Sequence, residues 1–186
     1  MTPAISPSET SNAAGLPPEL TFERITTVRS AAFEALADFV VRNPKGWLEA
    51  QGREPTRDDA IALLQRRPEG VTHEQKYLWG LHRGGELVGH IEVLRDFPEG
   101  ELCIGSLAIA ERLQRQGLGR ASLAQLAQRT RAWKNIRVWH VALNETQRGA
   151  HAFWRQNGFA ETGQRGTAPN NGAPLVVMER RVLRAL

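Results

Sequence analysis

The pattern of apolar and polar positions divides the chain into short strands and amphipathic helices. Apolar and polar residues alternate over 20–25, and apolar residues then recur at helical spacing over 33–40. A loop containing proline and glycine follows over 43–55. Thr56 with two aspartates behind it is typical of the start of a helix, which Pro68 ends. This part of the chain predicts one strand and two helices.

The middle of the chain follows a period of two. Strands are predicted over 76–83, 86–95 and 101–109, with turns at 84–85 and 96–100. Consecutive strands joined by tight turns pair antiparallel. The middle therefore predicts an antiparallel meander.

The last part alternates between helices and strands. The elements predicted there are a helix after Gly119, a strand over 136–143, a helix over 146–156, and paired strands over 159–165 and 175–183. A strand, helix and strand in one sheet require a crossover, so strand 136–143 is expected to lie parallel to strand 101–109. The expected fold class is α/β (α+β), with a mixed, mostly antiparallel central sheet flanked by helices.

Length and composition favour an ordinary globular protein. The chain has 186 residues, of which 41% are hydrophobic, and we expect one domain over 20–186. Residues 1–19 are rich in proline, serine, threonine and alanine without any period, which predicts a disordered tail.

The lone Cys103 excludes an internal disulfide and a multi-cysteine zinc site, and it indicates a reducing compartment. No apolar stretch approaches roughly 18 residues, and the start of the chain lacks the basic and apolar regions of a secretion signal. We therefore expect a cytoplasmic protein with no metal and no membrane partner.

The positive charge is concentrated in one segment. Seven basic residues and no acidic one lie from Arg112 to Arg137, while the whole chain has a net charge of +4. This segment holds one aromatic residue, Trp133, and surrounds a glycine turn, which favours a small phosphorylated ligand over nucleic acid. No nucleic-acid partner is expected, and a nucleic-acid-binding module is the least favoured alternative.

The segment Gln114–Arg120 follows a predicted strand, contains two glycines one residue apart and opens a helix. Free backbone N–H groups and the positive end of a helix dipole meet at such a place, and both attract phosphate. The segment lacks the Lys-Ser/Thr ending of a P-loop, and Ser122 stands where a Rossmann fingerprint has its third glycine. Mononucleotide and dinucleotide folds are therefore disfavoured.

Two motifs resemble those of a known family. Ser106-Leu107-Ala108-Ile109 followed by Gln114-x-x-Gly117-x-Gly119 resembles the acetyl-CoA signature of the GNAT superfamily of N-acetyltransferases, and 150–159, ending in Gly-Phe, resembles its last-helix motif. The resemblance extends over about residues 20–186. It implies a sheet in which the fourth and fifth strands, a parallel pair, splay apart, and it implies acetyl-CoA as co-substrate.

The resemblance also implies which residues contact CoA. The pantetheine arm would lie along Leu107, Ala108 and Ile109. The phosphates would lie at Gln114, Arg115, Gln116, Gly117, Leu118, Gly119 and Arg120. The family usually has an asparagine where this chain has Gln147, and Asn144 lies three residues earlier. Either amide is a candidate CoA contact.

The reaction implied is direct attack of an amine on the thioester within a ternary complex. A free alkyl amine has a pKa near 10.4, so only about one molecule in 10³ is nucleophilic at pH 7, and a base is expected. Some family members use a carboxylate at the place of Cys103, and Glu101 lies two residues before it on the same strand face. Glu101 is the first candidate; Glu92, His140 and a water relay are alternatives, and a covalent role for Cys103 is the least favoured.

Two further catalytic roles follow from the resemblance. A backbone N–H near Ile109 would stabilise the thioester oxygen. Trp154 stands where the family most often has a tyrosine that protonates the thiolate, and its indole N–H can donate a hydrogen bond but is not a usable acid. Trp154 is expected to pack against the CoA arm.

The expected function is transfer of an acetyl group to a primary amine of a small molecule or peptide. The alternative is a non-catalytic acyl-CoA-binding or interaction protein of the same fold. The acceptor would be shaped by residues 26–70 and 164–175, which carry no decodable motif. Whether the chain is a monomer or a homodimer stays open.

Overall fold

The computed structural model describes residues 19–182. The expected tail over 1–19 lies outside this part of the chain except for Glu19, as do residues 183–186. The described strands are β1 (Thr21–Arg24), β2 (Lys76–Arg83), β3 (Glu86–Arg95), β4 (Glu101–Ile109), β5 (Val138–Asn144), β6 (Ala160–Thr167) and β7 (Pro174–Arg181). The helices are α1 (Ala31–Arg42), α2 (Lys45–Gln51), α3 (Arg57–Gln65), α4 (Leu118–Arg129) and α5 (Arg148–Gln156), with a 3₁₀ turn η1 (Glu111–Leu113).

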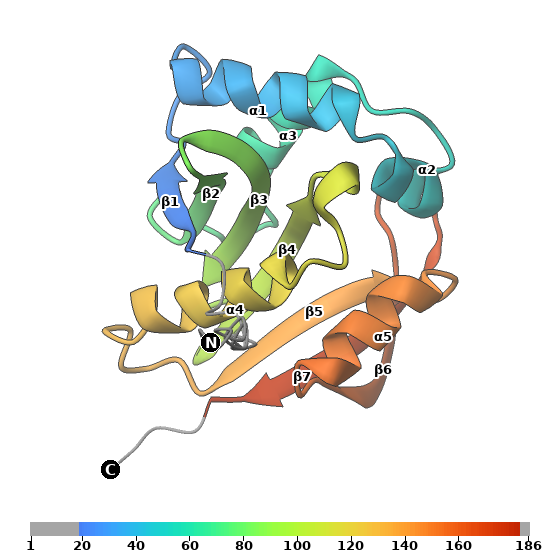
Figure 1. Cartoon of the computed structure of the whole chain (residues 1–186). Helices are drawn as coiled ribbons and strands as arrows, with labels where there is room; N and C mark the ends of the chain where they lie inside the picture. The colour runs from blue at the N-terminus through green and yellow to red at the C-terminus, as the bar shows by residue number, and fades with distance from the viewer. Residues whose placement is uncertain (1–18, 183–186) are drawn as a thin grey trace, which may run out of the picture.

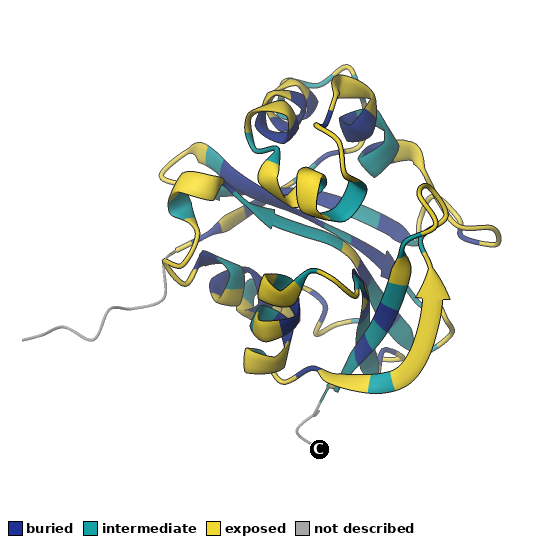
Figure 2. Ribbon diagram, turned by 90° about the vertical axis from the view of Figure 1, so that its right-hand side faces the viewer, coloured by how far each residue is buried: buried dark blue, intermediate teal, exposed yellow. Residues whose placement is uncertain are grey.

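All seven described strands form one sheet in the order β1-β2-β3-β4-β5-β7-β6. β4 and β5 pair in parallel, and every other neighbouring pair is antiparallel. The predicted mixed sheet with one parallel pair is therefore confirmed. β6 forms one edge and is exposed along most of its length (Figure 2).

Helices cover both faces of the sheet (Figures 1 and 2). On one face, α4 and α5 bury Leu126 and Trp154 against Ile104 of β4 and Trp139 of β5. On the other face, α1 and α3 bury Phe33 and other apolar side chains against the sheet. The sheet is therefore buried on both sides, which accounts for strands such as β3 that are apolar at consecutive positions.

α1 contains the residues that the sequence predicts to be helical and begins after Ser30. The Ser30 hydroxyl accepts a hydrogen bond from the N–H of Phe33 at 3.1 Å, which satisfies one of the free donors of the first turn. Phe33, Leu36 and Val40 are buried on one face of the helix. Helical spacing of apolar residues thus gave the right element.

The prediction of a continuous loop over 43–55 is wrong, because the helix α2 lies within it. The described residues of α2 include no buried one. Only Trp47 packs against the core, where it is half-buried. One such contact makes no apolar stripe, so the periodicity that reveals α1 is missing here. Its ends are held by contacts with distant parts of the chain, which the sequence pattern does not reveal.

The spacing of β3 and β4 depends on Gly89. A Cβ at this position would lie 2.4 Å from the carbonyl oxygen of Ala108 on β4, well inside van der Waals contact. The obstacle is backbone, so it cannot rotate away. Only glycine fits while the two strands keep their present distance.

We expect Gly89→Ala to lower the free energy of unfolding by about 1–3 kcal/mol, the usual cost of overpacking. Gly46→Ala is the matched control, because a Cβ at Gly46 of α2 meets nothing within 4 Å. It should leave stability unchanged or raise it by about 0.4–1 kcal/mol. Urea unfolding of both variants measures the difference, and equal stability would contradict the packing described here.

Candidate active site: the splay between β4 and β5

β4 and β5 are paired only at their beginnings. The register joins Glu101–Cys103 to Val138–His140 and goes no further. Beyond it, residues 104–109 of β4 and 141–144 of β5 run on without pairing to each other in the described part of the chain. The two strands therefore form a fork that opens toward their carboxyl ends (Figure 1).

A bulge at Gly105 coincides with the opening of the fork. On the β3 side, Ile104 pairs with Val93 and Ser106 with Glu92, so Gly105 is an extra residue in β4. A bulge of this kind bends its strand and increases the local twist. It turns the end of β4 away from β5.

The parity of the strand shows which backbone groups face the gap. The N–H of Ala110 donates to the carbonyl of Val88 on β3 at 2.9 Å. Because N–H groups of successive strand residues point to opposite sides, those of Leu107 and Ile109 point away from β3 and into the fork. These two N–H groups are available to an extended ligand, whereas the Ile109 carbonyl accepts a hydrogen bond from Gln114 Nε2 at 3.1 Å.

The glycine segment closes the open end of β4 and starts α4. Gly117 has φ of +81° and is the residue before the first helical one, and a Cβ there would meet nothing within 4 Å. A non-glycine residue is strained at this φ. The N–H groups of the first turn of α4 have no acceptor within the helix, and Arg120 in that turn is exposed. Loop and helix thus present free donors and positive charge beside the fork.

Gly119, the second glycine of the segment, is required for helix packing, whereas the sequence pattern suggested that it makes room for a ligand. Gly119 lies inside the first turn of α4, and a Cβ there would be 2.9 Å from the ring of Phe153 on α5. Its missing side chain lets α5 pack closely against α4. The side chain of Leu118 is fully buried, so only its backbone is available to a ligand.

The two candidate amides lie between β5 and α5. The Asn144 side-chain oxygen accepts hydrogen bonds from the N–H and the hydroxyl of Thr146, at 3.1 and 2.9 Å. Gln147 is the residue that precedes α5 and is half-buried. The oxygen of Asn144 therefore shapes the turn into α5.

Trp154 points into the core between α5 and the sheet. It is 4% exposed, and its ring packs edge-on against Phe153 and Phe159 with centroid distances of 5.1 and 4.8 Å. Its neighbour Phe153 is the residue that touches α4. The aromatic cluster fixes the position of α5 relative to the glycine segment.

Titratable groups gather on the opposite face of the sheet, where the fork begins. His140 Nδ1 lies 2.9 Å from Glu101 Oε2, although the two groups are not aligned for a hydrogen bond. Burial lowers the pKa of His140, and the charges of Glu101 and of Glu179 on β7 oppose this effect. At neutral pH, His140 is therefore an uncharged imidazole beside a carboxylate.

A second buried pair lies next to the bulge. Glu92 Oε1 is 2.6 Å from Lys76 Nζ, and the two side chains are 13% and 4% exposed. Burial raises the pKa of Glu92, which Lys76 counteracts. A Cβ at Gly105 would lie 3.2 Å from the Glu92 carboxylate, so the bulge and this carboxylate are in contact. The structure brings Glu92, Glu101 and His140 to one region but pairs Glu92 with a cation.

The sequence profile of the Acetyltransferase (GNAT) family matches residues 35–159, more than half of the chain. The chain belongs to this family. No curated protein matches it in sequence.

Solved structures share the GNAT fold with this chain. An acetyltransferase from Thermus thermophilus has 21% identity and a TM-score of 0.70, covering 89% of this chain and 99% of its own. The PaiA N-acetyltransferase from Thermoplasma acidophilum in complex with coenzyme A has 14% identity and a TM-score of 0.62, covering 88% and 99%. A GNAT family acetyltransferase from Elizabethkingia anophelis with acetyl-CoA bound has 13% identity and a TM-score of 0.58, covering 88% and 98%.

Two segments expected to shape the acceptor side of the GNAT site meet in space. Asn171, in the turn between β6 and β7, donates to the carbonyl of Ala50 in α2 at 3.0 Å. At the other end of α2, the N–H of Lys45 donates to Glu111 Oε1 at 2.8 Å, just beyond β4. α2 thus runs from the end of β4 to a turn beside the end of β5, as Figure 1 shows.

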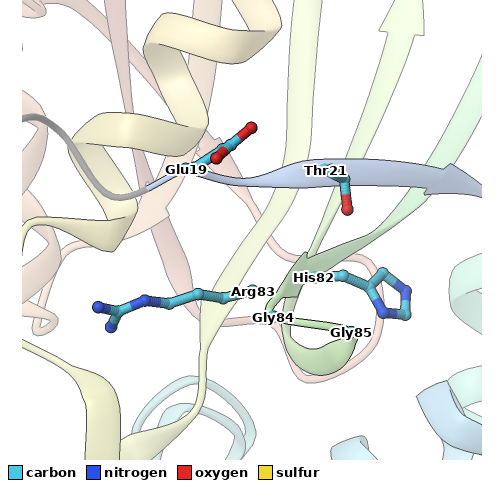
Figure 3. Close-up of a pocket in the computed structure, with 6 residues that line it drawn as sticks. All are labelled: Glu19, Thr21, His82, Arg83, Gly84 and Gly85. Carbon is cyan, nitrogen blue, oxygen red and sulfur yellow. The ribbon is translucent and has the colours of Figure 1, made fainter.

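Hollows elsewhere on the surface do not coincide with the fork. One of about 460 Å³ lies at β1 and the β2–β3 hairpin, at the far side of the sheet from β5 (Figure 3); its lining residues are Glu19, Thr21, His82, Arg83, Gly84 and Gly85. Another of about 300 Å³ lies between α4 and α5 and includes Arg120 and Arg180. The strand geometry and the glycine segment, rather than these hollows, identify the candidate site.

Within residues 19–182, no group of three or more His, Cys, Asp or Glu side chains is placed to hold a metal ion. No helix in the same range is long and apolar enough to cross a membrane.

Cys103 occupies the base of the fork. Burial raises the pKa of its thiol to about 12, and the charges of Glu92 and Glu101 add to this effect. A thiol is nucleophilic only as its thiolate. This argues against the covalent role that was the least favoured alternative.

We expect Cys103 to resist alkylation in the folded protein. At pH 8 about one thiol in 10⁴ would be ionised with the raised pKa, against about a quarter for an ordinary thiol of pKa near 8.5. Iodoacetamide labelling should be more than about 10³-fold slower in buffer than in 8 M urea, and the folded-state rate should still rise tenfold per pH unit above pH 9. Equal rates in both solvents would contradict the burial described here.

Proposed function

We propose that this GNAT chain transfers the acetyl group of acetyl-CoA to a primary amine of a small molecule or peptide, by direct attack within a ternary complex. The observation that carries the proposal is the fork between β4 and β5, which opens directly onto the glycine segment. An extended ligand with an anionic end fits both parts at once.

Acetyl-CoA matches this arrangement in charge and shape. Its phosphates would accept from the free N–H groups of the segment 114–120, with Arg115 and Arg120 as counter-charges. Its pantetheine arm would lie along Leu107–Ile109 and take the place of the missing β5 partner. The amide of Asn144 or Gln147 would contact the arm from the β5 side, and Trp154 would support it through the aromatic cluster of α5.

The N–H groups of Leu107 and Ile109 are the fixed donors that a developing oxyanion needs. Ile109 is nearer the phosphates, and Leu107 is deeper in the fork. In the reaction, the amine nitrogen forms a bond to the thioester carbon, the carbon–sulfur bond breaks, and the sulfur leaves with its electron pair as a thiolate. An acceptor that binds as an ammonium ion loses two protons in all: one before its nitrogen attacks, and one as the amide forms, which the thiolate or solvent takes up.

Glu101 and His140 are proposed to take the first of these protons as a unit. His140 has the lowered pKa of a base that is free at neutral pH, and Glu101 lies 2.9 Å from it. The carboxylate would stabilise the imidazolium that forms. Glu92 is less suited, because its carboxylate is already engaged with Lys76.

The acceptor is proposed to be cationic before it loses its proton. Glu101 and Glu179 both face His140 where the fork begins. A primary ammonium would be attracted to these carboxylates and would then meet the thioester from the face opposite α4 and α5. Turnover of acetyl-CoA with a panel of diamines, polyamines and peptides with free amino groups tests this assignment.

We expect acetyl-CoA to raise the melting temperature, because a ligand that binds only the folded state adds about 2.7 kcal/mol at a hundredfold excess over Kd. Gly117→Val should abolish this shift, since the side chain would enter the space assigned to the phosphates and strain the loop. Thermal unfolding with and without acetyl-CoA measures it.

Gly70→Val is the matched control for backbone strain. Gly70 has φ of +80° and, like Gly117, open space around its Cβ position. This variant should melt at a lower temperature yet keep the shift caused by acetyl-CoA. An unchanged shift in folded Gly117→Val would reject the phosphate assignment, and a shift in the wild type without transfer to any amine would favour a non-catalytic binder.

The pH profile separates the roles of Glu101 and His140. A base must be deprotonated, so kcat/KM of the wild type should fall as pH drops through the lowered pKa of His140. Glu101→Gln removes a charge that raises this pKa, so the acid limb should move to lower pH while turnover falls. Glu99→Gln, an exposed carboxylate in the preceding turn, should leave the profile unchanged. Loss of the limb in Glu101→Gln would instead make Glu101 itself the base.

A further inference from the structure

A buried histidine and a serine form a polar pair beside the fork. His90 Nε2 of β3 lies 2.9 Å from Ser106 Oγ of β4. His90 is 1% exposed, and its ring packs edge-on against Phe39 of α1. Its other ring nitrogen, Nδ1, is buried and has no hydrogen-bond partner among the described residues. The buried His90 side chain therefore has one polar contact among the described residues, the one with Ser106.

The lack of a partner for Nδ1 indicates which nitrogen of the His90 ring carries the proton. Burial lowers the pKa of His90 to about 4, so the imidazole is neutral at pH 7 and carries one N–H. On Nδ1, this N–H would be a buried donor without an acceptor, which costs free energy. On Nε2, it donates to Ser106. The serine hydroxyl then has its own hydrogen left to donate elsewhere.

The position of Ser106 in β4 indicates which group its hydroxyl hydrogen could be donated to. Ser106 is the first residue after the bulge at Gly105, and it is half-buried on the face of the sheet that carries Glu92. The next residue, Leu107, is the deepest one whose N–H points into the fork. The Ser106 hydroxyl, on one face of β4, and the N–H of Leu107, at the edge of β4, thus belong to adjacent residues at the end of the fork that the proposed function assigns to the thioester, away from the phosphates.

We propose that Ser106, its hydroxyl oriented by the N–H of His90, donates a hydrogen bond to the thioester oxygen of acetyl-CoA beside the N–H of Leu107. The inference rests on the proposed function and adds a second donor to the oxygen on which charge develops. Ser106 is then a catalytic residue and His90 a positioning residue. The ring is rigid and already desolvated, so the donor needs no reorganisation during the reaction.

The vibration of the thioester carbonyl tests this directly. Acetyl-CoA labelled with ¹³C at the carbonyl carbon is added to the full chain, and its band is recorded by difference infrared spectroscopy. Hydrogen bonds lower the stretching frequency, so the bound band should lie below that of free acetyl-CoA. In Ser106→Ala, the band should move back toward the free value while the Kd for acetyl-CoA changes by less than about threefold.

Variants of His90 separate positioning from packing. Gln has an N–H that reaches the place of Nε2, so His90→Gln should keep the wild-type band, whereas His90→Leu should resemble Ser106→Ala. With an accepted amine from the panel, Ser106→Ala should lower kcat about 10²-fold. His90→Leu should add nothing to that loss in the double variant, because both changes remove the same hydrogen bond.

Thr130→Val is the control for removing a buried hydroxyl. In the wild type, the Thr130 hydroxyl donates to the carbonyl of Leu126 in α4, away from the fork. The variant should change stability but neither the band nor kcat. An unmoved band in folded Ser106→Ala, or additive losses in the double variant, would overturn this inference alone. A wild-type chain that binds no acetyl-CoA would overturn the proposed function as well.

Discussion

The separation of β4 from β5 is the constraint on which the rest of the site depends. A strand that leaves its partner exposes backbone donors and acceptors, and each buried one left unpaired costs about 1–3 kcal/mol. Here the N–H groups of Leu107 and Ile109 point into the fork and have no strand partner there. The fold tolerates them because β4 stays paired with β3 along its other edge. Under the proposed function, this defect in the sheet would serve as the edge along which an extended molecule binds.

The two faces of the sheet differ in polarity around this edge. The face under α4 and α5 is apolar, with Trp139 and Trp154 in its core, and it places two helix starts beside the fork. The face under α1 and α3 holds polar side chains of the central strands that are buried or half-buried, including His90, Glu92 and His140. Under the proposed function, a co-substrate with phosphates and an amine acceptor would therefore approach one point from separate faces.

The sequence was sufficient for the frame of the site and insufficient for its chemistry. Strand parity, the crossover rule and the glycine segment predicted the parallel pair and the start of α4, because these are local patterns or consequences of chain connectivity. The contact of Glu101 with His140, by contrast, joins two strands whose register no local pattern fixes. The local pattern around Gly119 indicates a ligand site, whereas its packing against Phe153 depends on the placement of α5. The pair of His90 and Ser106 likewise joins two strands, and its only signal in the sequence is a histidine within an apolar strand.

The short helix α2 determines the width of the fork. Its first residue is tied to Glu111 beyond β4, and its last turn is tied to the β6–β7 turn, while Glu145 after β5 donates to Pro174 at the start of β7. The free ends of the two strands are therefore joined through a rigid spacer rather than through each other. The gap is open without a ligand, so under the proposed function association would require no prior opening of the sheet. A helix that adds only the half-buried Trp47 to the core thus contributes mainly by bridging the two strand ends.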